Sequence, residues 1–166
     1  MRYFTWLLAL SFILPACAQQ KLPRKNRAAT AVTAPTPSRE AEPVLVFQQT
    51  PCNGRCPTYT ATIFADGRVE YDGQRYVPRL GKHTLSLPPA TVAKLLAEAK
   101  SLHFEQLQER YAGNTTDLPA TIITVRQPGA TAKAVYAAES IPEKLQGYIN
   151  LLKHQLEPLA GLNMQE

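Results

Sequence analysis

The sequence has few of the residues that usually build catalytic and metal sites. It contains three histidines, three cysteines and one tryptophan. His83, His103 and His154 are far apart in the sequence, whereas a catalytic or metal site needs several such groups converging on one pocket. Neither a glycine-rich phosphate loop nor a serine in a nucleophile-elbow pattern is present. We therefore expect a protein without catalytic activity, cofactor or metal ion.

A hydrophobic run long enough to cross a membrane is also missing. The apolar run over residues 3–14 falls short of the roughly 20 residues that a transmembrane helix needs. It follows a single charge at Arg2 and precedes the small residue Ala16 and then Cys17, which is the layout of a secretory signal peptide. We predict that residues 1–16 are a signal peptide and that the protein is exported.

The residues around the expected cleavage site are similar to a bacterial lipoprotein signal. Leu14, Pro15, Ala16 and Cys17 resemble the lipobox, in which the cysteine after the cut receives lipid through its sulfur. Several acyl chains give a firm anchor, at about 0.8 kcal/mol per buried methylene group. The resemblance implies a membrane anchor at Cys17. Because residues 18–20 are not acidic, we expect an outer-membrane position facing the periplasm.

The sequence also has only a small excess of positive charge, with 18 Lys and Arg against 13 Asp and Glu. So small an excess does not indicate a nucleic-acid partner. Residues 17–42 are rich in Ala, Thr, Pro and Gln and have almost no large apolar side chains. Such a composition cannot offset the entropy lost on ordering, which predicts a disordered tether. The basic residues of this segment could bind anionic lipid head groups, and a plain soluble linker explains them equally well. They are Lys21, Arg24, Lys25, Arg27 and Arg39.

Residues 43–160 have the length and patterning of one small domain, followed by a frayed tail at 161–166. Apolar residues at helical spacing predict two helices, over residues 92–102 and 145–156. We expect strands at residues 44–47, 58–65, 68–72, 74–77, 83–87, 121–126 and 133–137. Hairpins rather than βαβ units indicate an α+β fold, an antiparallel sheet built from hairpins with two helices packed on one face.

Two local patterns give finer predictions. Asp66-Gly67 lies between β-rich runs, which favours a two-residue hairpin loop in which Phe64 faces Val69 and Thr62 faces Tyr71. At the start of the last helix, Ser140 and Glu143 match a capping box.

The segment with the most distinctive chemistry is residues 50–57, Thr-Pro-Cys-Asn-Gly-Arg-Cys-Pro. If Cys17 carries lipid, Cys52 and Cys56 remain as a pair in a compartment that permits disulfides. A structural disulfide closing a small ring is the simplest interpretation. A redox-active dithiol is an alternative, although thioredoxin-like sites place two residues between the cysteines, not three.

A copper site is another alternative, because Cys-x-x-x-Cys-Pro is similar to the copper-delivery motif of Sco-type assembly proteins and thiolates select Cu(I). A c-type haem needs Cys-x-x-Cys-His, which is absent. Glu70 and Asp72 share a strand face and could act as an acid–base pair, but an exposed strand face explains them as well.

The cysteine block and the residues after it, Thr58-Tyr59, Asp66-Gly67 and Tyr71 among them, resemble the bacterial family called domain of unknown function 6438. The resemblance runs from about residue 43 to residue 159 and implies no activity.

The function that these features favour is a non-catalytic envelope lipoprotein whose domain binds a protein, cell-wall or small-molecule partner. Arg55, held between the two cysteines, and the nearby Tyr59 are the expected contact residues, because arginine and tyrosine are enriched at binding hot spots. The alternative is a periplasmic thiol redox or copper-handling factor that uses Cys52 and Cys56.

Overall fold

The computed structural model of the chain describes residues 42–115 and 117–162. The expected signal peptide, Cys17 and the expected tether up to residue 41 lie outside the described residues. The elements follow in the order β1 (Leu45–Gln49), β2 (Thr58–Ile63), β3 (Arg68–Arg75), β4 (Gly81–Ser86), α1 (Pro89–Ser101), a 3-10 turn η1 (Phe104–Gln106), β5 (Arg110–Tyr111), β6 (Thr121–Val125), β7 (Lys133–Ala137) and α2 (Glu143–Leu156).

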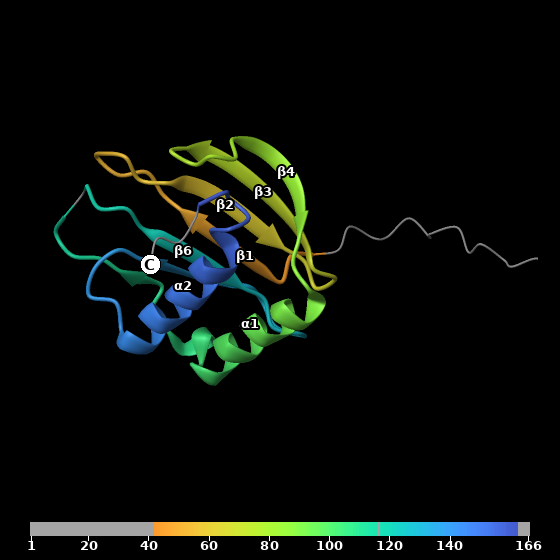
Figure 1. Cartoon of the computed structure of the whole chain (residues 1–166). Helices are drawn as coiled ribbons and strands as arrows, with labels where there is room; N and C mark the ends of the chain where they lie inside the picture. The colour runs from red at the N-terminus through yellow and green to blue at the C-terminus, as the bar shows by residue number, and fades with distance from the viewer. Residues whose placement is uncertain (1–41, 116, 163–166) are drawn as a thin grey trace, which may run out of the picture. The chain divides into compact units, whose positions relative to one another are not determined.

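The strands form one seven-stranded sheet in the order β4-β3-β2-β1-β6-β7-β5 within the described residues. Every neighbouring pair is antiparallel except β5 and β7, which are parallel. Figure 1 shows α1 and α2 on the same face of the sheet. The α+β class, with hairpins and two helices on one face, is therefore confirmed.

The core lies between this face and the helices because the strands alternate. Leu45 and Phe47 of β1 are 1% and 0% exposed, while Val46 between them points to the other face and is partly exposed. The helices contribute apolar stripes at helical spacing, as the sequence predicts: Val92, Leu95 and Ala99 from α1, and Leu145, Tyr148, Ile149, Leu152 and Leu156 from α2. The Tyr148 hydroxyl donates to the Leu95 carbonyl at 3.1 Å and joins the two helices.

The register of β1 defines the two ends of the sheet. Leu45 pairs with Ile63 on one side and Val125 on the other. The base end of the sheet is therefore the end where residues 42–44 lead into β1, together with the β2–β3 turn. Gln49 pairs with Tyr59 and with Thr121, so residues 50–57 and 117–120 lie at the opposite end, which we call the loop end.

The β2–β3 hairpin forms where expected, but its predicted register is wrong by one residue. The Phe64 N–H donates to the Arg68 carbonyl at 2.9 Å, so the loop contains three residues, 65–67, and not two. Gly67 has φ of +93°, the left-handed conformation that ends such three-residue loops in a bulge. In the observed register Val69 faces Ile63, and Tyr71 faces Ala61.

Three further details differ from the sequence-based predictions. Residues 74–77 are not a separate strand, because β3 runs to Arg75 and Tyr76 then turns with φ of +54°. Strand β5 was not expected. Helix α2 has Pro142 as its N-cap without a side-chain cap bond, and Ser140 has φ of +52°, so the predicted capping box is wrong.

The described fold continues slightly past the expected domain boundary. The Leu162 N–H donates to the Glu157 carbonyl at 2.9 Å, and its side chain packs partly buried against the core. Among the described helices, none has the length and apolar character to cross a membrane.

Candidate binding surface at the loop end of the sheet

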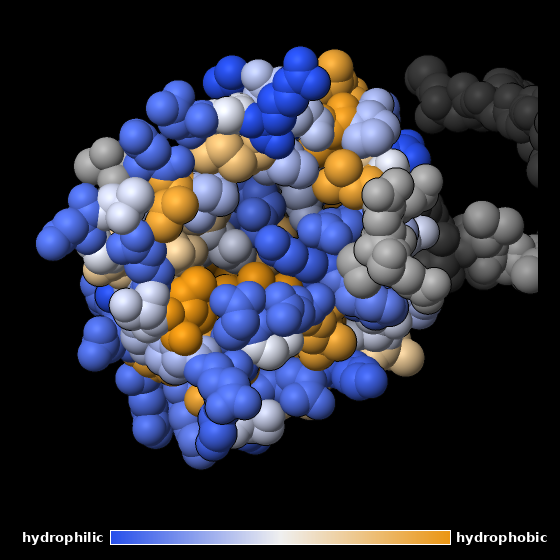
Figure 2. Space-filling model, turned by 60° about the vertical axis from the view of Figure 1, so that its left-hand side comes forward, coloured by the Kyte–Doolittle hydropathy of each residue, from blue (hydrophilic) through white to orange (hydrophobic). Residues whose placement is uncertain are grey.

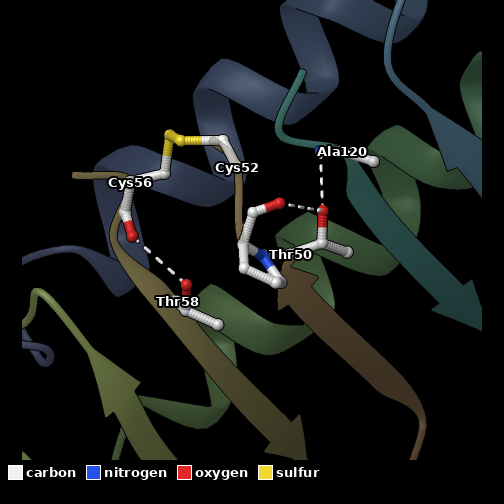
Figure 3. Close-up of a disulfide and its surroundings, with 6 residues drawn as sticks. Thr50, Cys52, Cys56, Thr58 and Ala120 are labelled. Atoms are coloured by element: carbon white, nitrogen blue, oxygen red, sulfur yellow. Dashed lines mark hydrogen bonds between the residues drawn. A yellow bond between two sulfur atoms is a disulfide. The ribbon is translucent and has the colours of Figure 1, made fainter. Parts of the chain in front are cut away.

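The loop between β1 and β2 contains the Cys52–Cys56 disulfide, drawn in Figure 3. The two Cα atoms are 5.8 Å apart, so the expected disulfide pairing is confirmed. The bond closes a ring over Asn53, Gly54 and Arg55, and all three of these residues are exposed. The ring therefore presents its middle residues to solvent.

Hydrogen bonds hold this loop against the segment that leads into β6. The Thr50 N–H donates to the Ala120 carbonyl at 2.9 Å, and the Ala120 N–H donates back to the Thr50 hydroxyl at 2.8 Å. The Asn53 N–H donates to the Asp117 carbonyl at 3.3 Å. On the other side of the ring, the Thr58 hydroxyl donates to the Cys56 carbonyl at 3.2 Å. The ring is thus fixed at both of its ends.

Exposed large hydrophobic side chains of the described residues gather at the same end. Tyr76 is 48% exposed, Leu80 is 60% exposed and Leu118 is 41% exposed. Arg75 pairs with Thr58, which places the β3–β4 loop with Tyr76 and Leu80 beside the end of the ring. Leu118 follows the segment that hydrogen-bonds Asn53. Figure 1 shows these three loops at one end of the domain, and Figure 2, which turns that side forward, shows hydrophobic areas set among hydrophilic ones.

The positive charges at this end have no ion-pair partner within the described residues. All ion pairs of the described residues involve other positions: Arg68 with Glu70, His103 with Glu105, Arg126 with Glu42 and Lys133 with Glu109. Arg55 is exposed, and the Arg75 guanidinium lies 5.4 Å from the centre of the Tyr76 ring. The loop end therefore combines uncompensated arginines with exposed apolar side chains, the composition of a binding surface.

Tyr59 does not reach this surface, although the sequence favoured it as a contact residue beside Arg55. It is 1% exposed, and its ring packs between Phe47 and Tyr71, with centroid distances of 5.9 and 5.6 Å. Burial, with smaller contributions from Glu157 and Tyr71, raises the pKa of the Tyr59 hydroxyl well above its usual range. Tyr59 supports the sheet under the loop end and cannot itself contact a partner.

The other candidate groups stay dispersed. His83 Nε2 lies 2.8 Å from the Leu80 carbonyl, His103 lies 3.7 Å from Glu105, and His154 lies 3.1 Å from Gln155. No group of three or more His, Cys, Asp or Glu side chains suited to a metal ion occurs in the part of the chain that the structure describes. Glu70 and Asp72 do share one face of β3, and Glu70 pairs with Arg68.

Sequence reasoning missed Tyr76, Leu80 and Leu118. The three residues come from separate segments, and only the pairing of β3 with β2 and of β6 with β1 brings those segments to one end. A weak signal exists in the prolines beside two of these segments, Pro78 and Pro119, which mark loops.

Comparison with known proteins places this fold in one family. The family model described as "Domain of unknown function (DUF6438)" matches residues 43–156, from the residues before β1 to the end of α2. No match was found among curated proteins or among solved structures. Because the matched segment is well over half of the chain, the protein belongs to the DUF6438 family of domains of unknown function.

Proposed function

We propose that this protein is a lipoprotein of the bacterial cell envelope, anchored through Cys17, whose domain is a non-catalytic binding module with its binding surface at the loop end. The observation that carries the proposal is the exposure of Tyr76, Leu80 and Leu118 in loops at the same end of the sheet as the disulfide ring, together with arginines that make no ion pair within the described residues. Exposed apolar side chains rimmed by polar groups mark interaction sites.

The anchor is supported by the signal-like residues 1–16 and by the lipobox-like residues that end at Cys17. The proposed location is the outer membrane, facing the periplasm. A chain held at Cys17 enters the domain at the base end. The five residues of β1 then rise by roughly 17 Å toward the loop end. The ring therefore lies at the opposite end of β1 from residues 42–44, and we propose that it is accessible there to an envelope protein or to cell-wall material.

The disulfide supports binding through preorganisation. A free loop loses conformational entropy when a partner immobilises it, whereas a loop already closed by a covalent bond loses less. The hydrogen bonds from Thr50 and Asn53 to residues 117–120 add to this effect. Arg55 in the ring is then presented in a restricted position.

The test replaces Arg55, which is exposed and makes no ion pair in the described part of the chain. Partners cross-linked to the full-length wild type in intact membranes are identified, and their capture is compared with that by Arg55→Ala. We expect an unchanged melting temperature and capture weakened by about tenfold, as for an arginine hot spot. Lys94→Ala, an exposed position on α1, is the matched control and should capture as wild type does. Equal capture by Arg55→Ala removes the ring from the interface.

A further inference from the structure

The face of the sheet opposite α1 and α2, which we call the open face, contains a hollow over β2, β3 and β4. Its volume is about 450 Å³, within the range of small-molecule sites. Six polar side chains of the open face line it: Thr60, Thr62, Glu70, Asp72, Lys82 and Thr84. The hollow therefore differs from the loop-end surface both in place and in chemistry.

Strand pairing explains why these side chains converge. Thr60 pairs with Asp72, and Asp72 pairs with Lys82, which makes one row across three strands. The next row on the same face joins Thr62, Glu70 and Thr84. Neighbouring strands lie about 4.8 Å apart, so each row brings its groups within reach of one small molecule.

Two of the three charged side chains that line the hollow, Asp72 and Lys82, make no ion pair within the described residues. Glu70 is paired with Arg68. Asp72 and Lys82 are direct cross-strand partners, yet among the described residues neither side chain makes a hydrogen bond or an ion pair. The hollow thus contains a carboxylate and an ammonium on neighbouring strands, and neither group makes a hydrogen bond or an ion pair within the described residues.

This arrangement selects the class of ligand. A bare anion would meet the carboxylates of Glu70 and Asp72, and a bare cation would meet the ammonium of Lys82. A sugar usually stacks on an aromatic ring. Tyr71 and His83 also line the hollow, but their side chains alternate to the opposite face of these strands, where their rings lie 6.3 Å apart and Tyr71 is only 2% exposed. A molecule with an amine and a carboxylate can satisfy both charges at once, and the threonine hydroxyls can bond its remaining polar atoms.

We propose that the hollow is a binding site for a small zwitterion, a free amino acid or short peptide whose amine contacts Asp72 and whose carboxylate contacts Lys82. Thr60 and Thr84, the neighbours of this pair on the open face, accept or donate the further hydrogen bonds. The site is independent of the loop end, so either can exist without the other.

The test uses alanyl-alanine as the probe and the ¹⁵N-labelled full-length protein in detergent micelles. We expect saturable shifts of the backbone amide signals of residues 60–62, 70–72 and 82–84. N-acetyl-alanyl-alanine lacks the ammonium and alanyl-alanine amide lacks the carboxylate, and each should bind about tenfold more weakly or not at all.

Variants of the protein test the two charged side chains, as the blocked peptides test the two charges of the ligand. Asp72→Asn and Lys82→Met should each weaken alanyl-alanine binding about tenfold while the rest of the spectrum stays that of the folded domain. Lys94→Met and Glu143→Gln, at exposed helix positions, are controls that should bind as wild type does. No saturable shift at the hollow, or equal binding of the free and both blocked peptides, overturns the proposal.

Discussion

Thr50 and Ala120 are joined by two hydrogen bonds, one in each direction. The Thr50 N–H donates to the Ala120 carbonyl at 2.9 Å, and the Thr50 hydroxyl accepts the Ala120 N–H at 2.8 Å. The two residues are 70 positions apart in the sequence. This pair ties the start of the disulfide loop to the segment that carries Leu118, so the ring and that segment act as one surface.

We predict that Thr50→Val lowers the free energy of unfolding by about 1–3 kcal/mol. Valine keeps the shape of threonine but removes the acceptor, and the N–H of Ala120, which is 0% exposed, then stays buried without a partner. Urea unfolding of the variant measures the change. Thr131→Val, at an exposed position, should be close to wild type. Wild-type stability of Thr50→Val would show that the hydrogen bond from the Ala120 N–H to the Thr50 hydroxyl contributes nothing to stability.

Replacing Cys17 by Ser should release the protein from membranes or leave it unprocessed, because serine cannot receive lipid through sulfur. Partitioning between detergent and aqueous phases measures this. A variant with Cys52→Ser and Cys56→Ser keeps Cys17 and should stay in the detergent phase. If Cys17→Ser is processed normally and still partitions with membranes, the anchor is not at Cys17.

Reduction of Cys52–Cys56 should lower the melting temperature by roughly 5–10 °C and leave a folded domain. So small a ring stabilises by about 2 kcal/mol through the entropy of the unfolded chain. Thermal unfolding with and without reductant tests this, and the double serine variant should not respond to reductant. Free thiols at both positions in protein taken from the envelope would contradict a structural disulfide and reopen a thiol redox or copper role.

Alkaline pH should destabilise the domain through buried tyrosines. Burial raises the pKa of the Tyr59 and Tyr148 hydroxyls above the ordinary value of 10.0. The unfolded chain loses these protons near pH 10 while the folded protein keeps them. Stability is therefore complete below about pH 10 and falls as the pH rises from there toward the folded-state pKa values. Urea unfolding between pH 8 and about 11.5 measures the fall.

Tyr59→Phe and Tyr148→Phe separate the two contributions. The Tyr59 hydroxyl is buried without a hydrogen-bond partner in the described residues, so its removal should leave stability at pH 7 equal or higher and reduce the alkaline loss. Tyr148 donates to Leu95, so its removal should cost about 1 kcal/mol at pH 7. If both variants lose as much stability at alkaline pH as the wild type does, the buried tyrosines are not the cause of that loss.

The fold class was predictable because periodicity reports on burial. The stripe from Leu145 to Leu156 and the alternation in β1 each require one apolar face, and both are present in the structure. The disulfide was also predictable, because the signal-like residues 1–16 predict export, and a disulfide is the simplest use of two cysteines four positions apart in an exported protein.

The strand register and the bounds of short elements were less predictable, because the conformation of single residues decides them. A single left-handed Gly67 lengthens the hairpin loop by one residue and changes the facing partner of every residue in β3. The burial of Tyr59 had a signal, since it alternates with Ala61 and Ile63, which face the core. Strand β5 has two residues and no pattern of its own, and the backbone of residues 136–138 fixes it.

The central claim is that the loop end contacts the partner, and site-specific photo-cross-linking in intact cells tests it most directly. A photoreactive amino acid is placed at Tyr76 or Leu118, and for comparison at Pro128, which is exposed at the base end. We predict a discrete cross-linked product from both loop-end positions, strongly reduced in the Arg55→Ala background, and none from Pro128. Products from Pro128 alone, or equally from all three positions, would contradict a binding surface at the loop end.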